Sequence, residues 1–180
     1  MISSSQFEVR NTVSTDLARL SALDHTINTD YVLQLDFRHD AIQTEMTLRE
    51  VRIPRTIRVT HPRPANELPD TWHLRPMLSA MIGMEAIAYI RFTDAFVPHA
   101  VWITDVVVGK PYRGLGVARK LITAAESWAI QRGLRKAMIE VQSKNSPGVR
   151  MIQKLGFEFC GYNDQYYYTK DIALFFARTI

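Results

Sequence analysis

The feature that most constrains the fold of this 180-residue chain is an apolar stretch that leads into a glycine-containing loop and then into a helical pattern. The stretch is Ala100 to Val108, and the loop reads "YRGLGVARK". Apolar residues from Val117 to Gln131 follow helical spacing, Gly133 is a natural stop, and Lys136 to Val141 has the composition of another strand. A strand, a helix and a strand within about 40 residues imply a right-handed crossover to a parallel neighbour. The sequence therefore predicts an α/β fold with a mixed sheet.

Turn residues and apolar alternation predict the remaining elements. In chain order these are a short helix over 15–22, strands over 31–37 and 42–59, a proline-rich loop over 61–76, a hairpin formed by 77–82 and 86–92, a helix over 147–155, and two C-terminal strands joined by a turn near Asn163. Because 180 residues fit a single domain, we interpret the proline-rich loop as a boundary between two parts of one domain.

Composition excludes several classes of protein. The chain is 47% hydrophobic and 22% charged, which excludes a disordered or collagen-like chain. Its longest apolar runs are too short to span a bilayer, and its start lacks the basic and then apolar pattern of a secretory signal. The single cysteine, Cys160, allows no internal disulfide, and its apolar surroundings predict a buried, inert thiol. We therefore expect a cytoplasmic protein with no membrane contact.

The basic residues raise a second interpretation. A net charge of +4 suits an anionic ligand, and the arginine-rich segment from Arg49 to Arg63 raises nucleic acid as one such ligand. However, the segment has no stacking aromatic residue, and Val51 and Ile53 interleave with its arginines, which favours a solvated strand face. We expect no nucleic-acid partner. The histidines show no paired metal-ligand spacing, so we expect no metal either.

The "YRGLGVARK" loop lies where a strand passes into a helix, and the free N–H groups of a helix N-terminus bind anions, above all phosphate. Two common phosphate loops do not fit it. The dinucleotide fingerprint requires a third glycine where Arg119 stands, and the Walker loop requires a lysine where Leu115 stands. The pattern that remains is Arg113, two residues, Gly116, one residue and Ala118.

This pattern resembles the pyrophosphate loop of the GNAT superfamily of acetyl-CoA-dependent N-acetyltransferases, in which Gln or Arg precedes two residues, Gly, one residue and Gly or Ala. The surrounding "ITDVVVGKPYRGLGVARKL" is similar to the family's strand, loop and helix start without a gap, and Asn145 with "LGF" at 155–157 fits its next motif. The resemblance covers Met77 to Phe157. It implies a GNAT-like mixed, mostly antiparallel twisted sheet with a parallel central strand pair and flanking helices. It also implies one N-acetyltransferase domain over 1–180, with acceptor-side strands and a helix in 1–76 and the acetyl-CoA-binding half in 77–180.

The resemblance further implies acetyl-CoA as the acetyl donor and assigns the residues that bind it. Backbone amides of the loop would hold the pyrophosphate, namely those of Arg113, Gly114, Leu115, Gly116, Val117, Ala118 and Arg119. The side chains of Arg113 and Arg119 would add charge-assisted hydrogen bonds. The pantetheine arm would pair as an added strand along Val106, Val107 and Val108, with the acetyl carbonyl near 106 or 107. Asn145 would bond the arm from the other side, cap the following helix, or do both.

The reaction also needs a base. Acetyl transfer needs a neutral amine, and a lysine-like amine with a pKa of about 10.4 is mostly protonated at neutral pH. Some relatives use a glutamate on the strand before the loop, where this chain has Thr104. The neighbouring Asp105 is our candidate base, but strand alternation can point it away from the acceptor, so a structural role is equally open. Glu140 and Glu158 are further options.

The general acid departs from the family pattern. Many relatives carry a tyrosine acid where this chain has Ile152. Tyr162 is our candidate replacement, with tyrosines 166–168 as alternatives that also suit a core or a substrate wall. The missing tyrosine also supports a rival hypothesis, a regulatory module that binds acetyl-CoA without transferring the acetyl group.

The acceptor is expected to be a primary amine of a small molecule or a peptide, acetylated by direct transfer in a ternary complex. The "TDYVLQLDF" segment and the tail are faintly similar to streptothricin acetyltransferase-like members of the superfamily. Other small amines, peptides and protein N-termini stay open. The final strand "IALFFA" either completes the sheet or pairs across a dimer axis, and we expect a homodimer.

Overall fold

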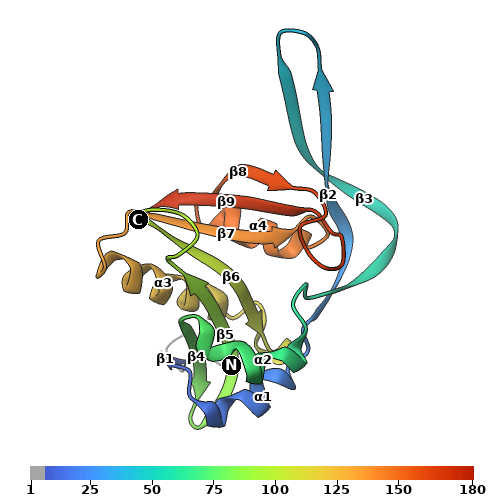
Figure 1. Cartoon of the computed structure of the whole chain (residues 1–180). Coiled ribbons are helices and arrows are strands. Elements are labelled where there is room, and N and C mark those ends of the chain that lie inside the picture. Colours follow the sequence, from blue (N-terminus) through green and yellow to red (C-terminus); the bar gives the residue numbers. More distant parts are fainter. Residues whose placement is uncertain (1–6) are drawn as a thin grey trace.

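The structure is a computed structural model that describes residues 7–180 (Figure 1). Residues 1–6 lie outside the described residues. They include part of the segment used above for the expectation about a secretory signal and the start of the predicted domain.

The body of the molecule is built on one seven-stranded sheet. Its strand order is β1 (Glu8–Asn11), β4 (Met77–Ile82), β5 (Glu85–Thr93), β6 (Ala100–Val108), β7 (Lys136–Gln142), β9 (Ala173–Thr179) and β8 (Glu158–Asn163). Neighbouring strands are antiparallel except for the central β6 and β7, which are parallel. The structure therefore confirms the predicted mixed, mostly antiparallel sheet with a parallel central pair.

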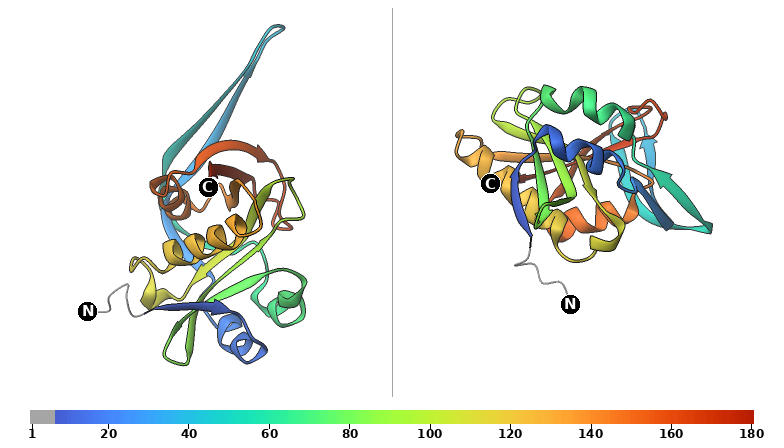
Figure 2. Two further views of the ribbon diagram at one scale, coloured as in Figure 1. Left: turned by 90° about the vertical axis from the view of Figure 1, so that its left-hand side faces the viewer. Right: turned by 90° about the horizontal axis from the view of Figure 1, so that it is seen from below.

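Helices cover both faces of this sheet (Figure 2). Helices α3 (Val117–Ile130) and α4 (Ser146–Lys154) pack their apolar stripes on the main core, as their helical spacing predicts. Helices α1 (Leu17–Ser21) and α2 (Leu68–Thr71) bury Leu20 and Leu68 in a second, smaller core on the other face. Because both faces are covered, β6 is almost continuously apolar. No helix within residues 7–180 is long and apolar enough to cross a membrane.

Three local expectations are wrong. The segment 61–76 is not all loop, because it contains α2 and two short 3-10 turns, and Pro69 lies in the first turn of α2, where proline is tolerated. The last two strands are joined by a longer loop over 164–172, not by a tight turn. Cys160 is exposed, because β8 is an edge strand and Cys160 lies on its uncovered side. The final strand β9 lies between β7 and β8, so it completes the sheet and forms no edge.

The strands β2 (Thr26–His39) and β3 (Thr44–Thr60) form a separate antiparallel hairpin. Strand β2 has 14 residues and is longer than the predicted strand over 31–37, whereas β3 is close to the predicted strand over 42–59. The distal half of the hairpin projects from the body (Figures 1 and 2). The hairpin is fixed to the body at mid-length by a backbone hydrogen bond of 2.8 Å from Leu33 to Ser143 and by a two-pronged ion pair between Arg150 and Glu50. The residues after β3 are held beside β6 and β7 by Arg63, which donates to Thr104 and Glu140.

The separation of β6 and β7 positions the site. The two strands pair only between Ala100–Ile103 and Lys136–Ile139, although both continue further. One extra residue in β6, Thr104, interrupts its register with β5, and such a bulge bends its strand and increases the local twist. We call the point where the two strands separate, just beyond Ile103 and Ile139, the fork.

Candidate functional site

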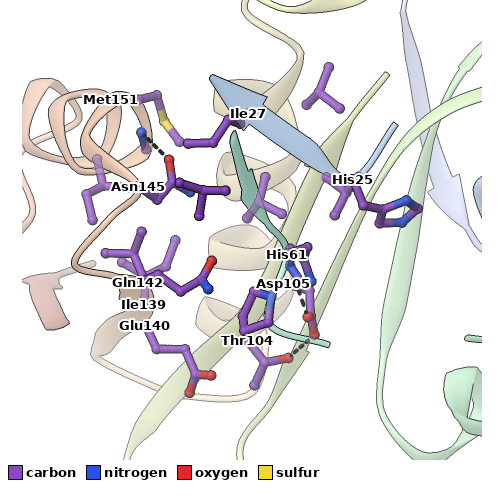
Figure 3. A pocket seen from close by; sticks show the side chains of 18 of the residues that line it. His25, Ile27, His61, Thr104, Asp105, Ile139, Glu140, Gln142, Asn145 and Met151 are labelled. Carbon is purple, nitrogen blue, oxygen red and sulfur yellow. Dashed lines mark hydrogen bonds and ion pairs between the residues drawn. The ribbon is translucent and has the colours of Figure 1, made fainter. Parts of the chain in front are cut away.

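A cavity of about 130 Å³ opens in the fork (Figure 3). Its walls come from β6, β7, the start of α4, the segment before β2, and the end of β3 with the residues that follow. Polar and charged lining residues are Asp24, His25, His61, Thr104, Asp105, Arg113, Glu140, Gln142, Asn145 and Tyr167. Segments from both halves of the sequence therefore meet at one site.

One wall of the cavity is an open strand edge. Beyond Ile103, the side of β6 that faces β7 has no strand partner within residues 7–180. Val106, Val107 and Val108 line the cavity along this edge, with their side chains packed in the two cores. Because an unpaired edge pairs readily with an extended chain through its backbone groups, this wall suits an extended, amide-containing ligand.

The glycine loop provides a site for an anion at the start of α3. Gly114 and Gly116 have φ angles of 79° and 83°, in the left-handed region that glycine adopts at no steric cost. No atom lies within 4 Å of a Cβ built on either glycine, so the loop is open to a ligand. Among residues 7–180, the backbone N–H groups of residues 114–119 have no hydrogen-bond acceptor. Such free amides at a helix start bind phosphate.

The two arginines of the loop differ in what their side chains do. The guanidinium of Arg113 donates to the backbone carbonyls of Val108, Thr26 and Asp24, so it fixes the loop to the strand edge and to the segment before β2. It is thus not the free cation that the sequence predicts for a pyrophosphate. Arg119 is exposed in the first turn of α3, where it has no ion-pair partner among the described residues. Its predicted role stays a prediction.

Asn145 caps α4, as the sequence predicts. Its Oδ1 accepts a hydrogen bond of 2.9 Å from the N–H of Gly148. A Cβ on Gly148 would lie 2.7 Å from the same Oδ1, so this cap requires glycine. The Nδ2 group of Asn145 is not used by the cap, and the residue lines the cavity (Figure 3), so the second predicted role stays open as a prediction.

Asp105 lies at the fork as a fully buried carboxylate with several donors around it. Thr104 Oγ1 donates to it at 2.7 Å, and His61 Nε2 lies at 3.4 Å (Figure 3). Arg63 Nη1 lies 3.3 Å from the same carboxylate. Burial by itself raises the pKa of Asp105, but His61, Arg63, Thr104 and Arg91 together hold the pKa below its ordinary value. Asp105 is therefore an ionised group at neutral pH and a weak proton acceptor.

Glu140 lies on β7, across the fork from Asp105. Its side chain is buried, and its carboxylate accepts hydrogen bonds from Arg63, from Trp102 Nε1 at 2.7 Å and from the Tyr166 hydroxyl at 3.1 Å. Burial and Glu140 raise the pKa of Tyr166 to about 12, so this tyrosine stays a neutral donor. Glu158, the other acidic option, is exposed on β8 and does not line the cavity.

Two histidines for which the sequence predicts no functional role, His25 and His61, lie in loop segments and line the cavity. His61 is buried beside Asp105, and His25 is hydrogen bonded between the Leu23 carbonyl and the Tyr89 hydroxyl. Burial lowers the pKa of both imidazoles, so both are neutral at pH 7. No local signal marks either histidine, because Tyr89 and Asp105 lie more than 40 positions away in the sequence.

The tyrosine expected to act as the acid is placed elsewhere. Tyr162 lies on the edge strand β8, where its ring packs on Phe37 of the hairpin with centroids 4.9 Å apart, and it does not line the cavity. Ile152 is buried and lines the cavity without any proton to give. Tyr167 lines the cavity, and its hydroxyl has no hydrogen-bond partner among residues 7–180. Burial raises its pKa, so the phenol keeps its proton.

No cluster of three or more His, Cys, Asp or Glu side chains in the described part of the chain is arranged to hold a metal ion. The site consists of the glycine loop, an open strand edge and a buried charged fork.

Comparisons with known sequences match this chain to one protein family. The sequence profile described as "Acetyltransferase (GNAT) family" matches residues 45–157, more than half of the chain. Two streptothricin acetyltransferases match in part. The one from Streptomyces lavendulae is 29% identical over 87 residues, which cover 48% of this chain and 43% of the relative. The one from Escherichia coli is 37% identical over 82 residues, which cover 46% of this chain and 47% of the relative. The match thus spans about half the length of these curated relatives.

Solved structures show the fold over nearly the whole chain. A nourseothricin acetyltransferase superposes with a TM-score of 0.82 at 23% identity, covering 97% of this chain and 98% of that one. A proposed streptothricin acetyltransferase from Bacillus anthracis, in complex with acetyl coenzyme A, superposes with a TM-score of 0.75 at 20% identity, covering 97% and 99%.

Proposed function

Because the chain belongs to the acetyltransferase (GNAT) family, we propose that it moves an acetyl group from acetyl-CoA to a primary amine of a small molecule, by direct transfer in a ternary complex. One observation carries this proposal. Within residues 7–180, the amides over 114–119 and the unpaired edge of β6 are separated by only residues 109–113, and that edge lines the cavity at the fork. An anion site next to a strand edge suits a ligand with a pyrophosphate at one end and an extended amide arm at the other.

The residues fit acetyl-CoA in three places. The amides over 114–119 would hold its pyrophosphate, with Arg119 as the nearby exposed cation. The amide of Arg113, also predicted for this role, instead donates to the Lys110 carbonyl. The edge at Val106–Val108 would pair with the pantetheine arm, and the free Nδ2 of Asn145 would bond that arm from the opposite wall. When bound, acetyl-CoA supplies an acetyl thioester with a thiolate leaving group.

The couple of His61 and Asp105 is our proposal for proton removal from the acceptor amine. A neutral imidazole can take a proton, whereas an ion-paired aspartate with a lowered pKa is a poor base by itself. Asp105 lies 3.4 Å from His61 Nε2 and would stabilise the imidazolium that forms. The base role predicted for Asp105 is thus shared with His61. For the departing thiolate, the unbonded hydroxyl of Tyr167 replaces Tyr162 as the proposed donor.

The acceptor class rests on the relatives. Matching proteins are named for streptothricin and, in Salmonella, for the 6′-amine of aminoglycosides, and both kinds of protein act on small molecules by name. We propose an antibiotic-like amine of this kind as the acceptor, with peptide amines as the second choice. The rival function, a non-catalytic module that binds acetyl-CoA, is favoured by one observation, the buried Ile152 at the position of the family's usual acid.

A thiol-release assay with acetyl-CoA tests both functions. The purified chain is incubated with streptothricin, aminoglycosides, polyamines and N-terminal peptides, and free CoA is measured. We expect release that depends on one of the first two classes. An Asp105→Asn variant should lower kcat while acetyl-CoA binding by calorimetry is retained. Tight acetyl-CoA binding without release on any acceptor would favour the regulatory module, and no binding would contradict both.

A further inference from the structure

The arginine-rich segment over 49–63, interpreted from the sequence as a solvated face, contains one arginine that turns inward. The side chains of Arg49 and Arg58 are 60% and 71% exposed and pair with acidic residues at the surface of the hairpin. The side chain of Arg63 is 28% exposed, and its guanidinium lies at the fork between two buried carboxylates. A role in the surface charge of the chain does not explain this placement.

The contacts of Arg63 join the two strands at the point where they separate. Its Nη1 donates to the carbonyl of Thr104 at 2.8 Å and lies 3.3 Å from Oδ1 of Asp105. Its Nη2 donates to Oε1 of Glu140. Thr104 and Glu140 are the first residues beyond the paired stretches of β6 and β7. The guanidinium therefore occupies the vertex of the fork and contacts the first unpaired residue of each strand.

The bulge in β6 makes this contact necessary. Thr104 is the extra residue of the bulge, and it is 3% exposed, so its backbone carbonyl needs a donor from within the protein. Arg63 supplies that donor and at the same time balances the charges of Asp105 and Glu140. A planar guanidinium can donate in several directions at once, which the single ammonium of a lysine cannot do with the same geometry.

We propose that Arg63 is a positioning residue for the cofactor, which holds the fork open and thereby sets the edge of β6 at Val106–Val108 against the acyl-carrying arm. The inference rests on the proposed function, since it assumes that this edge binds the pantetheine arm of acetyl-CoA. It assigns no role to Arg63 at the glycine loop, which is a separate part of the site. Arg63 should therefore affect the binding of the arm and not the binding of the pyrophosphate.

The test compares two ligands on two variants. Dissociation constants are measured by calorimetry for acetyl-CoA and for adenosine 3′-phosphate 5′-diphosphate, which has the pyrophosphate but no pantetheine arm. For Arg63→Lys we expect the dissociation constant for acetyl-CoA to rise about tenfold. The dissociation constant for the nucleotide should stay within about twofold of the wild-type value. Arg63→Met should raise the dissociation constant for acetyl-CoA further than Arg63→Lys does. The matched control is Arg55→Met, an exposed arginine of β3, which should change neither constant.

The outcomes separate the inference from the function. If wild type binds acetyl-CoA and Arg63→Lys binds it equally well, the inference is overturned. Equal weakening of both ligands also overturns it, because a general structural role would act on the whole site. If Arg63→Met does not fold, the lysine variant decides alone. A wild-type chain that binds no acetyl-CoA would overturn the proposed function, and this inference with it.

Discussion

At the glycine loop the site is lined by main-chain amides from consecutive residues, whereas at the fork it is lined by side chains from separate segments. The loop over 113–119 needs only a helix start and two glycines with positive φ. The fork needs Arg63 from the segment after β3, Asp105 from β6 and Glu140 from β7 to meet with their charges balanced. The candidate anion site therefore depends on residues close together in the sequence and on no pairing of buried charges. The fork is a cooperative arrangement, in which the loss of one charged group leaves the others unpaired.

The largest effect is expected from removing a charge at the fork. Asp105→Ala leaves the Arg63 and Arg91 guanidinium groups without their shared carboxylate, and breaking a buried ion pair in this way costs about 3 kcal/mol of unfolding free energy. Urea unfolding followed by circular dichroism measures it. The control Asp36→Ala removes an exposed partner of Arg49 and should cost less than about 1 kcal/mol. Equal losses in the two variants would contradict the distinction between the fork and the surface.

A smaller change in stability, with a large change in binding, is expected at the loop. Gly116→Ala places a Cβ at a φ of 83° in the space where the anion binds, which costs about 1 kcal/mol in backbone strain and should weaken acetyl-CoA binding by roughly tenfold or more. Gly133→Ala is the matched control, because its φ is 74° and its Cβ also meets no atom, but it follows α3 at the other end. Thermal unfolding should shift equally in both variants, and only Gly116→Ala should lose affinity. If both lose affinity alike, the loop is not the anion site.

The smallest effect concerns pH. Burial lowers the pKa of His61 in the folded state, so the unfolded chain takes up the proton first as the pH falls. The free energy of unfolding is therefore highest above the unfolded pKa of about 6.5 and decreases as the pH falls below it. Between pH 7 and pH 6 this amounts to at most about 0.7 kcal/mol for one histidine. Urea midpoints of wild type should fall over this range more than those of His61→Gln. The exposed His39→Gln should follow wild type. A wild-type slope unchanged in His61→Gln would show that His61 does not titrate in this way.

Much of the fold could be predicted, because its signals are local. The helical spacing from Val117 and the stop at Gly133 are set by residues within a few positions of one another, and the structure confirms both. The same holds for the cap at Asn145, whose partner is three residues away. The sequence predicts both strands of the hairpin and nearly the full length of β3, but not the full length of β2 or the projection of the hairpin from the body, since these depend on contacts with α4.

The candidate site was predictable only in its loop. The sequence offers four tyrosines as the general acid, at 162 and 166–168, and contains no signal that separates them. Tyr167 lies at the cavity, whereas Tyr162 packs on the hairpin. The direction of Asp105 depended on the bulge at Thr104, which shifts the alternation of β6 by one residue and has no mark in the sequence.

The strand, the glycine loop and the helix that follows can be predicted from the sequence, because backbone conformation and helix-start amides depend on neighbouring residues. The set of side chains that meet at the fork follows from the fold, because these residues are far apart in the sequence. Arg63 reaches Asp105 across 42 positions and Glu140 across 77. The two carboxylates are buried by the surrounding sheet, so they need the charge of Arg63 beside them, and this arrangement exists only in the folded chain.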